Sequence, residues 1–245
     1  NGETLVLNGT PQTSDGTFSG PGIKNLGNGL ASFDPSGLSA GDYNITYSYQ
    51  HPVTGCTNEK TKTLTILNNP KQFALSPDAT ICEGDSAEIK LMDSENGIQY
   101  ELIRNDAAIV KTMPGGGSEL SFGYLKQDGT YKVKAFNASC GVLLHDSVHL
   151  TVNETPLKYQ VLGDTAYCIG ESGISVELSG SQTGVNYILK KNGNNEDTIP
   201  GTGGSLSWKN RNQGIYRIVA ENEVNGCKTS MNGHLKVSEY DTPDA

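Results

Sequence analysis

The segment Gly129-Thr-Tyr131-Lys-Val133-Lys-Ala135 decides the fold, because it alternates side chains as a half-buried strand does and because it recurs. It returns with substitutions as Gly214-Ile-Tyr216-Arg-Ile218-Val-Ala220, and a more distant copy reads Gly41-Asp-Tyr43-Asn-Ile45-Thr-Tyr47. The last two copies are offset by 85 residues here (129 to 214) and by 87 at their final cysteines (140 to 227). A period this long indicates whole domains in tandem rather than a solenoid.

Other motifs of the second copy return in the third at nearly the same spacing. A residue that recurs in every copy belongs to the framework, so a residue unique to one copy is the better candidate for a local function. The recurring motifs are Cys82-Glu-Gly84 as Cys168-Ile-Gly170, Tyr100-Glu-Leu102 as Tyr187-Ile-Leu189, Pro114–Ser118 as Pro200–Ser205, Leu120-Ser-Phe122 as Leu206-Ser-Trp208, and Cys140 as Cys227.

Strand candidates with an apolar alternation of period two recur along the chain, separated by Gly, Asn or Asp. This pattern predicts an all-β chain of three tandem β-sandwich domains in an elongated array. The segments Asn68-Asn69-Pro70 and Asn153-Glu-Thr155-Pro156 mark short joints, since proline cannot donate to a strand ladder. We therefore expect domains at residues 1–68, 69–153 and 154–240, followed by a tail at residues 241–245.

The composition excludes several classes of function. The formal net charge is -9, and a field of this sign repels phosphate backbones, so we expect no nucleic-acid partner. No stretch approaches the roughly 18 apolar residues of a membrane span, so we expect no direct membrane insertion. The 245 residues are 35% hydrophobic and include 30 glycines, which suits thin domains whose strands each bury one side.

The five cysteines constrain the cellular location. Counting within the repeats favours one disulfide per domain, Cys82 with Cys140 and Cys168 with Cys227, which leaves Cys56 unpaired. Paired cysteines indicate an oxidising compartment. Another outcome stays open, because Cys82 precedes the second strand and Cys140 follows the sixth. Unless the strand order differs or the first cysteine sits where the chain crosses the sandwich, the two lie beyond the Cα limit of roughly 7 Å for a bridge.

The first domain differs from the others at its start. Leu5-Val-Leu7 occupies the place of Ile89-Lys-Leu91, and counting back from Leu7 to the expected leading cysteine runs past residue 1. The chain begins Asn-Gly-Glu, with no signal peptide. We therefore expect an N-terminally truncated first domain, with further domains of the same polypeptide as its partners.

We find no set of residues with the arrangement of a catalytic site. The four histidines do not recur among the copies and lack acidic or thiol partners at metal-binding spacing, so we predict no catalytic residue, metal or cofactor. The glycine runs lack the Lys-Ser/Thr and the helix of a phosphate loop, and predict turns. Trp208 matches Phe122 and Phe33 in the other copies, which predicts that it packs in a core.

Two groups of residues have a more specific expectation. In immunoglobulin-like sandwiches, a tyrosine near the start of the sixth strand donates its hydroxyl to the backbone of the preceding corner. Tyr43, Tyr131 and Tyr216 are placed for this framework role. The loop at residues 190–195 differs from its counterpart at 103–108, and loops on such scaffolds often carry function. Its candidate ligand-binding residues are Lys190, Lys191, Asn192, Asn194 and Asn195.

These motifs resemble the immunoglobulin-like repeats of giant surface and secreted proteins of Bacteroidota, including gliding adhesins. The resemblance rests on the Gly-x-Tyr segments, the Gly-rich turns, Ile81-Cys82-x-Gly84 and the closing Gly55-Cys56 and Gly226-Cys227. It implies export through the type IX route to the cell surface or outside. It also implies O-glycans on Ser or Thr within Asp-Ser/Thr-apolar triplets. The candidates are Ser86, Ser147, Thr165 and Thr198.

We expect a non-catalytic spacer or adhesion segment of a large surface protein, because the repetition is that of a framework and the joints are short. Two alternatives stay open. The domains could bind glycans or surface proteins of a host or a neighbouring cell through their loops, or they could be accessory domains of a secreted enzyme.

Overall fold

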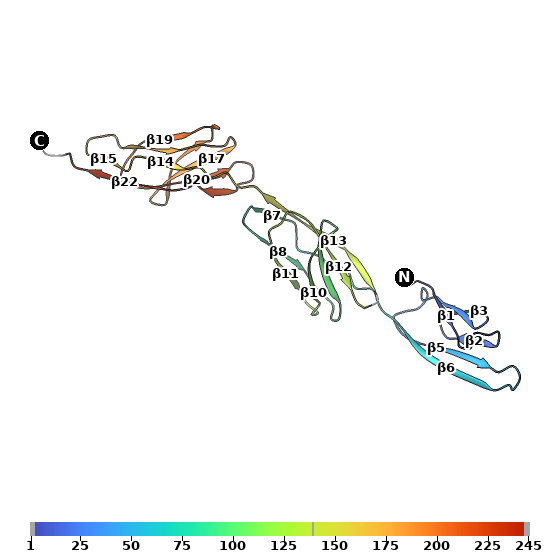
Figure 1. Cartoon of the computed structure of the whole chain (residues 1–245). Helices are drawn as coiled ribbons and strands as arrows, with labels where there is room; N and C mark the ends of the chain where they lie inside the picture. The colour runs from blue at the N-terminus through green and yellow to red at the C-terminus, as the bar shows by residue number, and fades with distance from the viewer. Residues whose placement is uncertain (1–2, 139, 243–245) are drawn as a thin grey trace.

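The computed structural model describes residues 3–138 and 140–242, and this part of the chain contains strands and no helix. Three immunoglobulin-like sandwiches follow one another in an elongated array, from the blue first domain to the red third domain (Figure 1). The predicted fold class is therefore confirmed. The predicted boundary at residue 68 lies between two strands, and the one at residue 153 is the last residue of a strand. Both boundaries stay a prediction.

Each domain packs two sheets against each other. In the first domain, one sheet has the order β1 (Leu5–Asn8), β4 (Leu30–Phe33), β3 (Ile23–Gly27), and the other β2 (Gly16–Ser19), β5 (Gly41–Gln50), β6 (Thr57–Ile66). In the second, the sheets are β10 (Ala108–Pro114), β9 (Gln99–Arg104), β12 (Gly129–Phe136), β13 (Gly141–Asn153), β7 (Ala79–Cys82), and β11 (Leu120–Leu125) with β8 (Ala87–Leu91).

The third domain repeats this plan with two short additions. Its smaller sheet has the order β14 (Val161–Gly163), β16 (Ile174–Leu178), β19 (Leu206–Arg211). Its larger sheet has the order β15 (Ala166–Cys168), β22 (Leu235–Tyr240), β20 (Gly214–Asn222), β17 (Val185–Lys191), β18 (Asn194–Pro200), and β21 (Lys228–Ser230) also pairs with β20.

The second and third domains share a parallel edge strand that the sequence pattern did not predict. β7 runs parallel to β13 with Cys82 opposite Asn153, and β15 runs parallel to β22 with Cys168 opposite Tyr240. The pairing puts each leading cysteine beside the end of its domain's last strand. Among the described residues of the first domain, no strand pairs with the free edge of β6.

The alternating positions build a separate core in the second and third domains. Phe122 and Trp208 are buried at equivalent places, as is Phe33 in the first domain, so the tryptophan packs in a core as its repetition predicts. The registers agree, because Leu7 pairs with Ala31 as Leu178 pairs with Leu206. The first domain buries less at this place, since Leu5 is 50% exposed.

The three framework tyrosines make the same contact. The hydroxyls of Tyr43, Tyr131 and Tyr216 each donate to the carbonyl four residues earlier, at 2.8, 2.7 and 2.6 Å. This is the corner contact that their position predicts. Burial raises the pKa of the Tyr131 hydroxyl and raises that of Tyr216 to about 12, so the fold favours the neutral hydroxyl that donates this hydrogen bond.

Candidate functional site at the junction of the second and third domains

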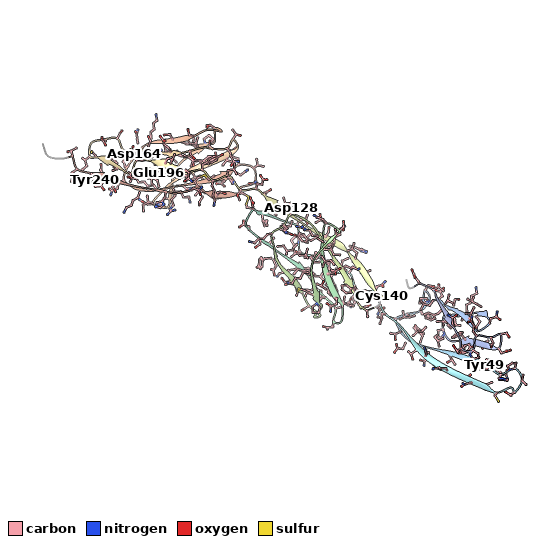
Figure 2. The ribbon with its side chains drawn as sticks, in the orientation of Figure 1. Tyr49, Asp128, Cys140, Asp164, Glu196 and Tyr240 are labelled. Atoms are coloured by element: carbon pink, nitrogen blue, oxygen red, sulfur yellow. A yellow bond between two sulfur atoms is a disulfide. The ribbon has the colours of Figure 1, made fainter. Side chains whose placement is uncertain are left out.

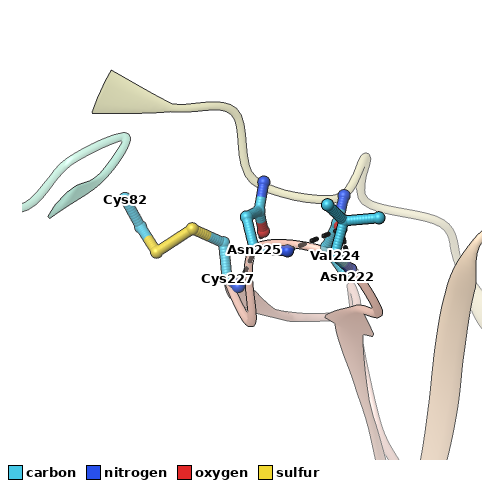
Figure 3. Close-up of a disulfide and its surroundings, with 5 residues drawn as sticks. All are labelled: Cys82, Asn222, Val224, Asn225 and Cys227. Carbon is cyan, nitrogen blue, oxygen red and sulfur yellow. Dashed lines mark hydrogen bonds between the residues drawn. A yellow bond between two sulfur atoms is a disulfide. The ribbon is translucent and has the colours of Figure 1, made fainter. Parts of the chain in front are cut away.

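A disulfide joins the second domain to the third. Cys82, the last residue of β7, bonds to Cys227 in the turn between β20 and β21, with the two Cα atoms 5.6 Å apart (Figure 3). Cys56, Cys140 and Cys168 are free. The predicted bonds within the domains, Cys82 with Cys140 and Cys168 with Cys227, were therefore wrong. Of the three free cysteines, Cys56 is the one that was predicted to be free.

The parallel edge strand is the physical reason for this correction. Cys82 lies opposite Asn153 at the end of β13, whereas Cys140 precedes the first residue of that strand. Thirteen residues of extended chain (140 to 153) span roughly 40 Å. The two cysteines of one domain thus lie at opposite ends of the sandwich. This was the alternative that the positions along the sequence left open.

The turn that carries Cys227 is held by its own hydrogen bonds. The Asn222 amide donates to the Cys227 carbonyl at 2.9 Å, and the Gly226 amide donates to the Asn222 carbonyl at 2.9 Å. The side-chain oxygen of Asn225 accepts from the Cys227 amide at 2.9 Å. Gly226 takes a φ of 71°, which favours glycine. The cysteine is therefore presented on a preformed loop, and Val224 at the tip is 95% exposed (Figure 3).

The other half of the bond is held as firmly. The Glu83 amide donates to the Asn153 carbonyl at 2.8 Å, and the Asp85 amide donates to the Cys82 carbonyl at 2.9 Å. Gly84 between them has a φ of 98°. These contacts tie the leading cysteine to the end of β13, from which the linker to the third domain leaves. The bond and the linker therefore connect the same two domain ends.

An open cavity of about 520 Å³ lies beside the disulfide and is lined from both domains. Asp85 and Ser86 line it from the second domain, and Asn225 lines it from the third. These groups offer hydrogen bonds to a polar molecule. The residues that line the cavity include no histidine and no nucleophile paired with a base.

The predicted ligand loop forms a tight hairpin between β17 and β18. Asn192 takes a φ of 51° at the turn, its amide donates to the Ile215 carbonyl at 2.8 Å, and its side chain accepts from the Ile215 amide at 2.9 Å. Asn105 makes the same two contacts with Thr130 in the second domain, at 2.9 and 3.0 Å. Asn192 therefore belongs to the framework that the two domains share. The comparison of the two loop sequences missed this role, because the loops differ around the shared asparagine.

The other residues of that loop are less engaged. The ammonium of Lys191 lies 5.7 Å from the centre of the Tyr216 ring, and Lys190 is half-buried beside β20. Asn194 and Asn195 are exposed. A ligand would therefore meet the two asparagines first, and their role in binding stays a prediction.

The candidate O-glycosylation residues lie at four separate places. Ser147, Thr165 and Thr198 are exposed, whereas Ser86 is half-buried beside the junction cavity. Accessibility therefore favours the first three, and modification itself stays a prediction.

A second set of equivalent contacts, around the Gly-rich turns, was not predicted from the sequence. Ser94 and Ser181 are buried, and each hydroxyl donates to a carbonyl of the Gly-rich turn, Ser118 or Gly204, at 2.6 Å. The hydroxyls of Tyr100 and Tyr187 accept from the amides of Glu95 and Gln182, both at 2.9 Å.

Glycine is required at this turn. A Cβ on Gly115 would lie 2.2 Å from the carbonyl oxygen of Glu95, and one on Gly201 would lie 1.9 Å from that of Gln182. The Tyr-x-Leu motif and the glycine runs were the available signals for this framework.

The described residues contain no cluster of three or more potential metal-binding His, Cys, Asp or Glu side chains. Within the same residues, no helix has the length and hydrophobicity needed to cross a membrane.

Comparison with solved structures finds tandem immunoglobulin domains. The I-band fragment I67–I69 of titin matches with a TM-score of 0.50 and 15% identity, covering 97% of this chain and 93% of that chain. Extracellular domains 3–5 of Drosophila OTK match with a TM-score of 0.38 and 14% identity, covering 99% and 92%. The eight N-terminal domains of DSCAM match with a TM-score of 0.40 and 15% identity, covering 97% and 34%.

No protein-family model and no curated protein matches the chain. At 15% identity, the similarity to the titin fragment shows the shared fold, three immunoglobulin domains in a row, and nothing of the function.

Proposed function

We propose that this chain is a non-catalytic spacer section of a large bacterial surface or secreted protein, which holds binding parts away from the cell. The observation that carries the proposal is the covalent bond between domains, Cys82 to Cys227. A bond beside the linker limits how far two domains can rotate against each other. Restricted rotation suits a spacer that keeps its length under load.

The linkers support the same function, because both are short and both end on the same contact. The Lys71 amide donates to a carboxylate oxygen of Glu95 at 2.7 Å, and the Leu157 amide donates to the side-chain oxygen of Gln182 at 2.7 Å. The chain is thus anchored to each following domain at the residue directly after the proline. Anchoring of this kind shortens the segment that is free to flex.

The proposed location is the cell surface or the outside, because disulfides persist in oxidising compartments. The resemblance of the repeats to gliding adhesins of Bacteroidota motivates the finer proposal of type IX export and of O-glycans at the four triplets. The intact mass of protein from its native host tests the glycans, since an unmodified mass would contradict them.

Small-angle scattering in solution tests the spacer function. We expect a maximum dimension close to that of three domains end to end and a narrow distribution of shapes. A compact particle, or a broad distribution like that of freely jointed domains, would contradict the proposal. The double variant C82S/C227S is the matched control, because it removes only the covalent link.

A second candidate function is binding of a glycan or a cell-surface protein through the hairpin between β17 and β18. The exposure of Asn194 and Asn195 beyond the shared framework favours it. A glycan array probed with the whole chain tests it, with the variant N194A/N195A as control. Binding that the variant abolishes would support this function, and an array without signal would count against glycan recognition.

A further inference from the structure

The three free cysteines occupy the same positions as the two bonded ones. Cys168 ends the edge strand of the third domain as Cys82 ends that of the second. Cys56 and Cys140 sit just before the last long strand of their domains, and Cys227 has the same place after β20. The five cysteines thus form two classes, leading cysteines and turn cysteines, and the observed bond joins one of each class.

Two backbone hydrogen bonds and one glycine hold Cys168 as they hold Cys82. The Ile169 amide donates to the Tyr240 carbonyl at 2.9 Å, as the Glu83 amide does to Asn153. The Glu171 amide donates to the Cys168 carbonyl at 3.1 Å, and Gly170 takes a φ of 94° where Gly84 has 98°. Cys168 is half-buried, like Cys82. The Cys168 thiol therefore lies beside the end of the last strand of the third domain. Cys82 has the same position in the second domain, where it bonds to Cys227.

The turn of Cys56 is a copy of the turn of Cys227. The His51 amide donates to the Cys56 carbonyl at 2.8 Å, and the Gly55 amide donates to the His51 carbonyl at 2.9 Å. Gly55 has a φ of 68°. Val53 at the tip is 87% exposed, as Val224 is in the third domain. Cys56 thus lies on the loop geometry that carries the bonded cysteine.

A sequence repeat beyond the cysteines supports the same relation. Tyr240-Asp-Thr242-Pro243 has the form of Asn153-Glu-Thr155-Pro156, the linker that leaves the second domain. Both begin at the residue opposite a leading cysteine. A leading cysteine and the linker sequence opposite it therefore occur together in the third domain as they do in the second.

We propose that Cys168 and Cys56 are docking half-sites for further modules of this same kind, and that each junction bond joins the leading cysteine of one module to the turn cysteine of the next. Cys168 accepts the turn cysteine of a module that follows, and Cys56 accepts the leading cysteine of a module that precedes. The assignment goes beyond the spacer function, because it holds equally for an array that binds a ligand.

Bond formation needs an oxidant of the disulfide class, such as oxidised glutathione. The two thiols lose two protons and two electrons and form one sulfur–sulfur bond. The oxidant accepts them, its own sulfur–sulfur bond breaks, and it leaves as two thiols.

The test extends the full chain with a second copy of its own third domain, residues 157–245 placed directly after Pro243. This repeats the natural linker in sequence, with Leu157 directly after the proline. In the first variant, the added copy carries C168S, so that Cys168 of the original domain is the only leading cysteine facing the added Cys227. In the second variant, the original domain carries C168S and the added copy keeps both cysteines. Each protein is refolded in a glutathione redox buffer, alkylated and weighed intact.

The proposal predicts a bond between Cys168 and the added Cys227 in the first variant, leaving Cys56 and Cys140 as its alkylated thiols. In the second variant it predicts that both cysteines of the added domain are alkylated. Emission typical of buried tryptophan for both copies of Trp208, with no exposed component, shows that the added domain is folded. A folded first variant with Cys168 alkylated would overturn the proposal, as would a bond within the added domain of the second variant.

Discussion

The two junctions of this chain use the same linker contacts but differ in their covalent link. At the second junction Cys82 bonds to Cys227. Cys140, which Figure 2 labels at the end of the second domain nearer the first domain, is free. The described residues of the first domain hold no edge strand and no cysteine at the place that β7 and Cys82 have in the second domain. The difference teaches that a junction bond needs one cysteine from each of two neighbouring repeats, so a count within one repeat cannot find it.

Removing the bond at the second junction is expected to have the largest effect on stability. The cysteines are 145 residues apart in sequence, and in the chain-entropy model a bond that closes a loop of this length contributes roughly 5 kcal/mol. We expect C82S/C227S to lower the free energy of unfolding by up to that amount, measured by urea denaturation. The variant C56S is the control, because Cys56 is exposed and free. Equal losses in both variants would contradict a structural role for the bond.

Supplying the missing half at the first junction should make the two junctions alike. A copy of residues 71–86 placed ahead of Glu3 adds an edge strand and its leading cysteine. We expect Cys140 to form a disulfide with that cysteine and to become resistant to alkylation, as read by peptide mass spectrometry. The same extension with serine in place of the cysteine is the control. Alkylation of Cys140 in both extended proteins would show that the first junction does not follow the second.

The Gly-rich turn that supports the first linker anchor is expected to tolerate no side chain at Gly115. Gly115→Ala would place a Cβ 2.2 Å from the carbonyl oxygen of Glu95, the residue that holds Lys71. We expect a loss of about 1–3 kcal/mol in stability from this overlap, measured by urea denaturation. Gly116→Ala is the matched control, because no atom lies within 4 Å of a Cβ at that glycine. Similar stability of the two variants would be evidence against this packing.

At alkaline pH, the stability of the third domain should fall more steeply than that of a variant without the Tyr216 hydroxyl. Burial raises the folded-state pKa of Tyr216 to about 12 from 10.0, so the fold favours the neutral hydroxyl. This contribution is fully present below pH 10 and is lost as the pH rises from about 10 through 12. Circular dichroism should show alkaline unfolding in this window, with a weaker pH dependence in Tyr216→Phe. At neutral pH, that variant should lose about 1 kcal/mol with its hydrogen bond.

Much of the fold follows from the sequence, because repeated residues have repeated roles. The Gly-x-Tyr segments predict the corner tyrosines, and the match of Trp208 to Phe33 and Phe122 predicts a core position. These inferences succeed because the side-chain alternation of a strand and the local corner contact both leave short-range marks in the sequence.

The candidate site could not be predicted in the same way. The parallel pairing of β7 with β13 brings together residues about 70 apart in sequence and leaves no periodic mark, as in Cys82 opposite Asn153. The bond itself crosses between repeats. The roles of Asn105 and Asn192 were missed because their loops differ in sequence around one shared residue.

Peptide mapping of the unreduced chain tests the junction bond most directly. After alkylation of free thiols and proteolysis, we expect one crosslinked pair containing Cys82 and Cys227, with Cys56, Cys140 and Cys168 all alkylated. Crosslinked pairs of Cys82 with Cys140 and of Cys168 with Cys227 would instead show that each domain is braced internally and that no covalent link joins the domains.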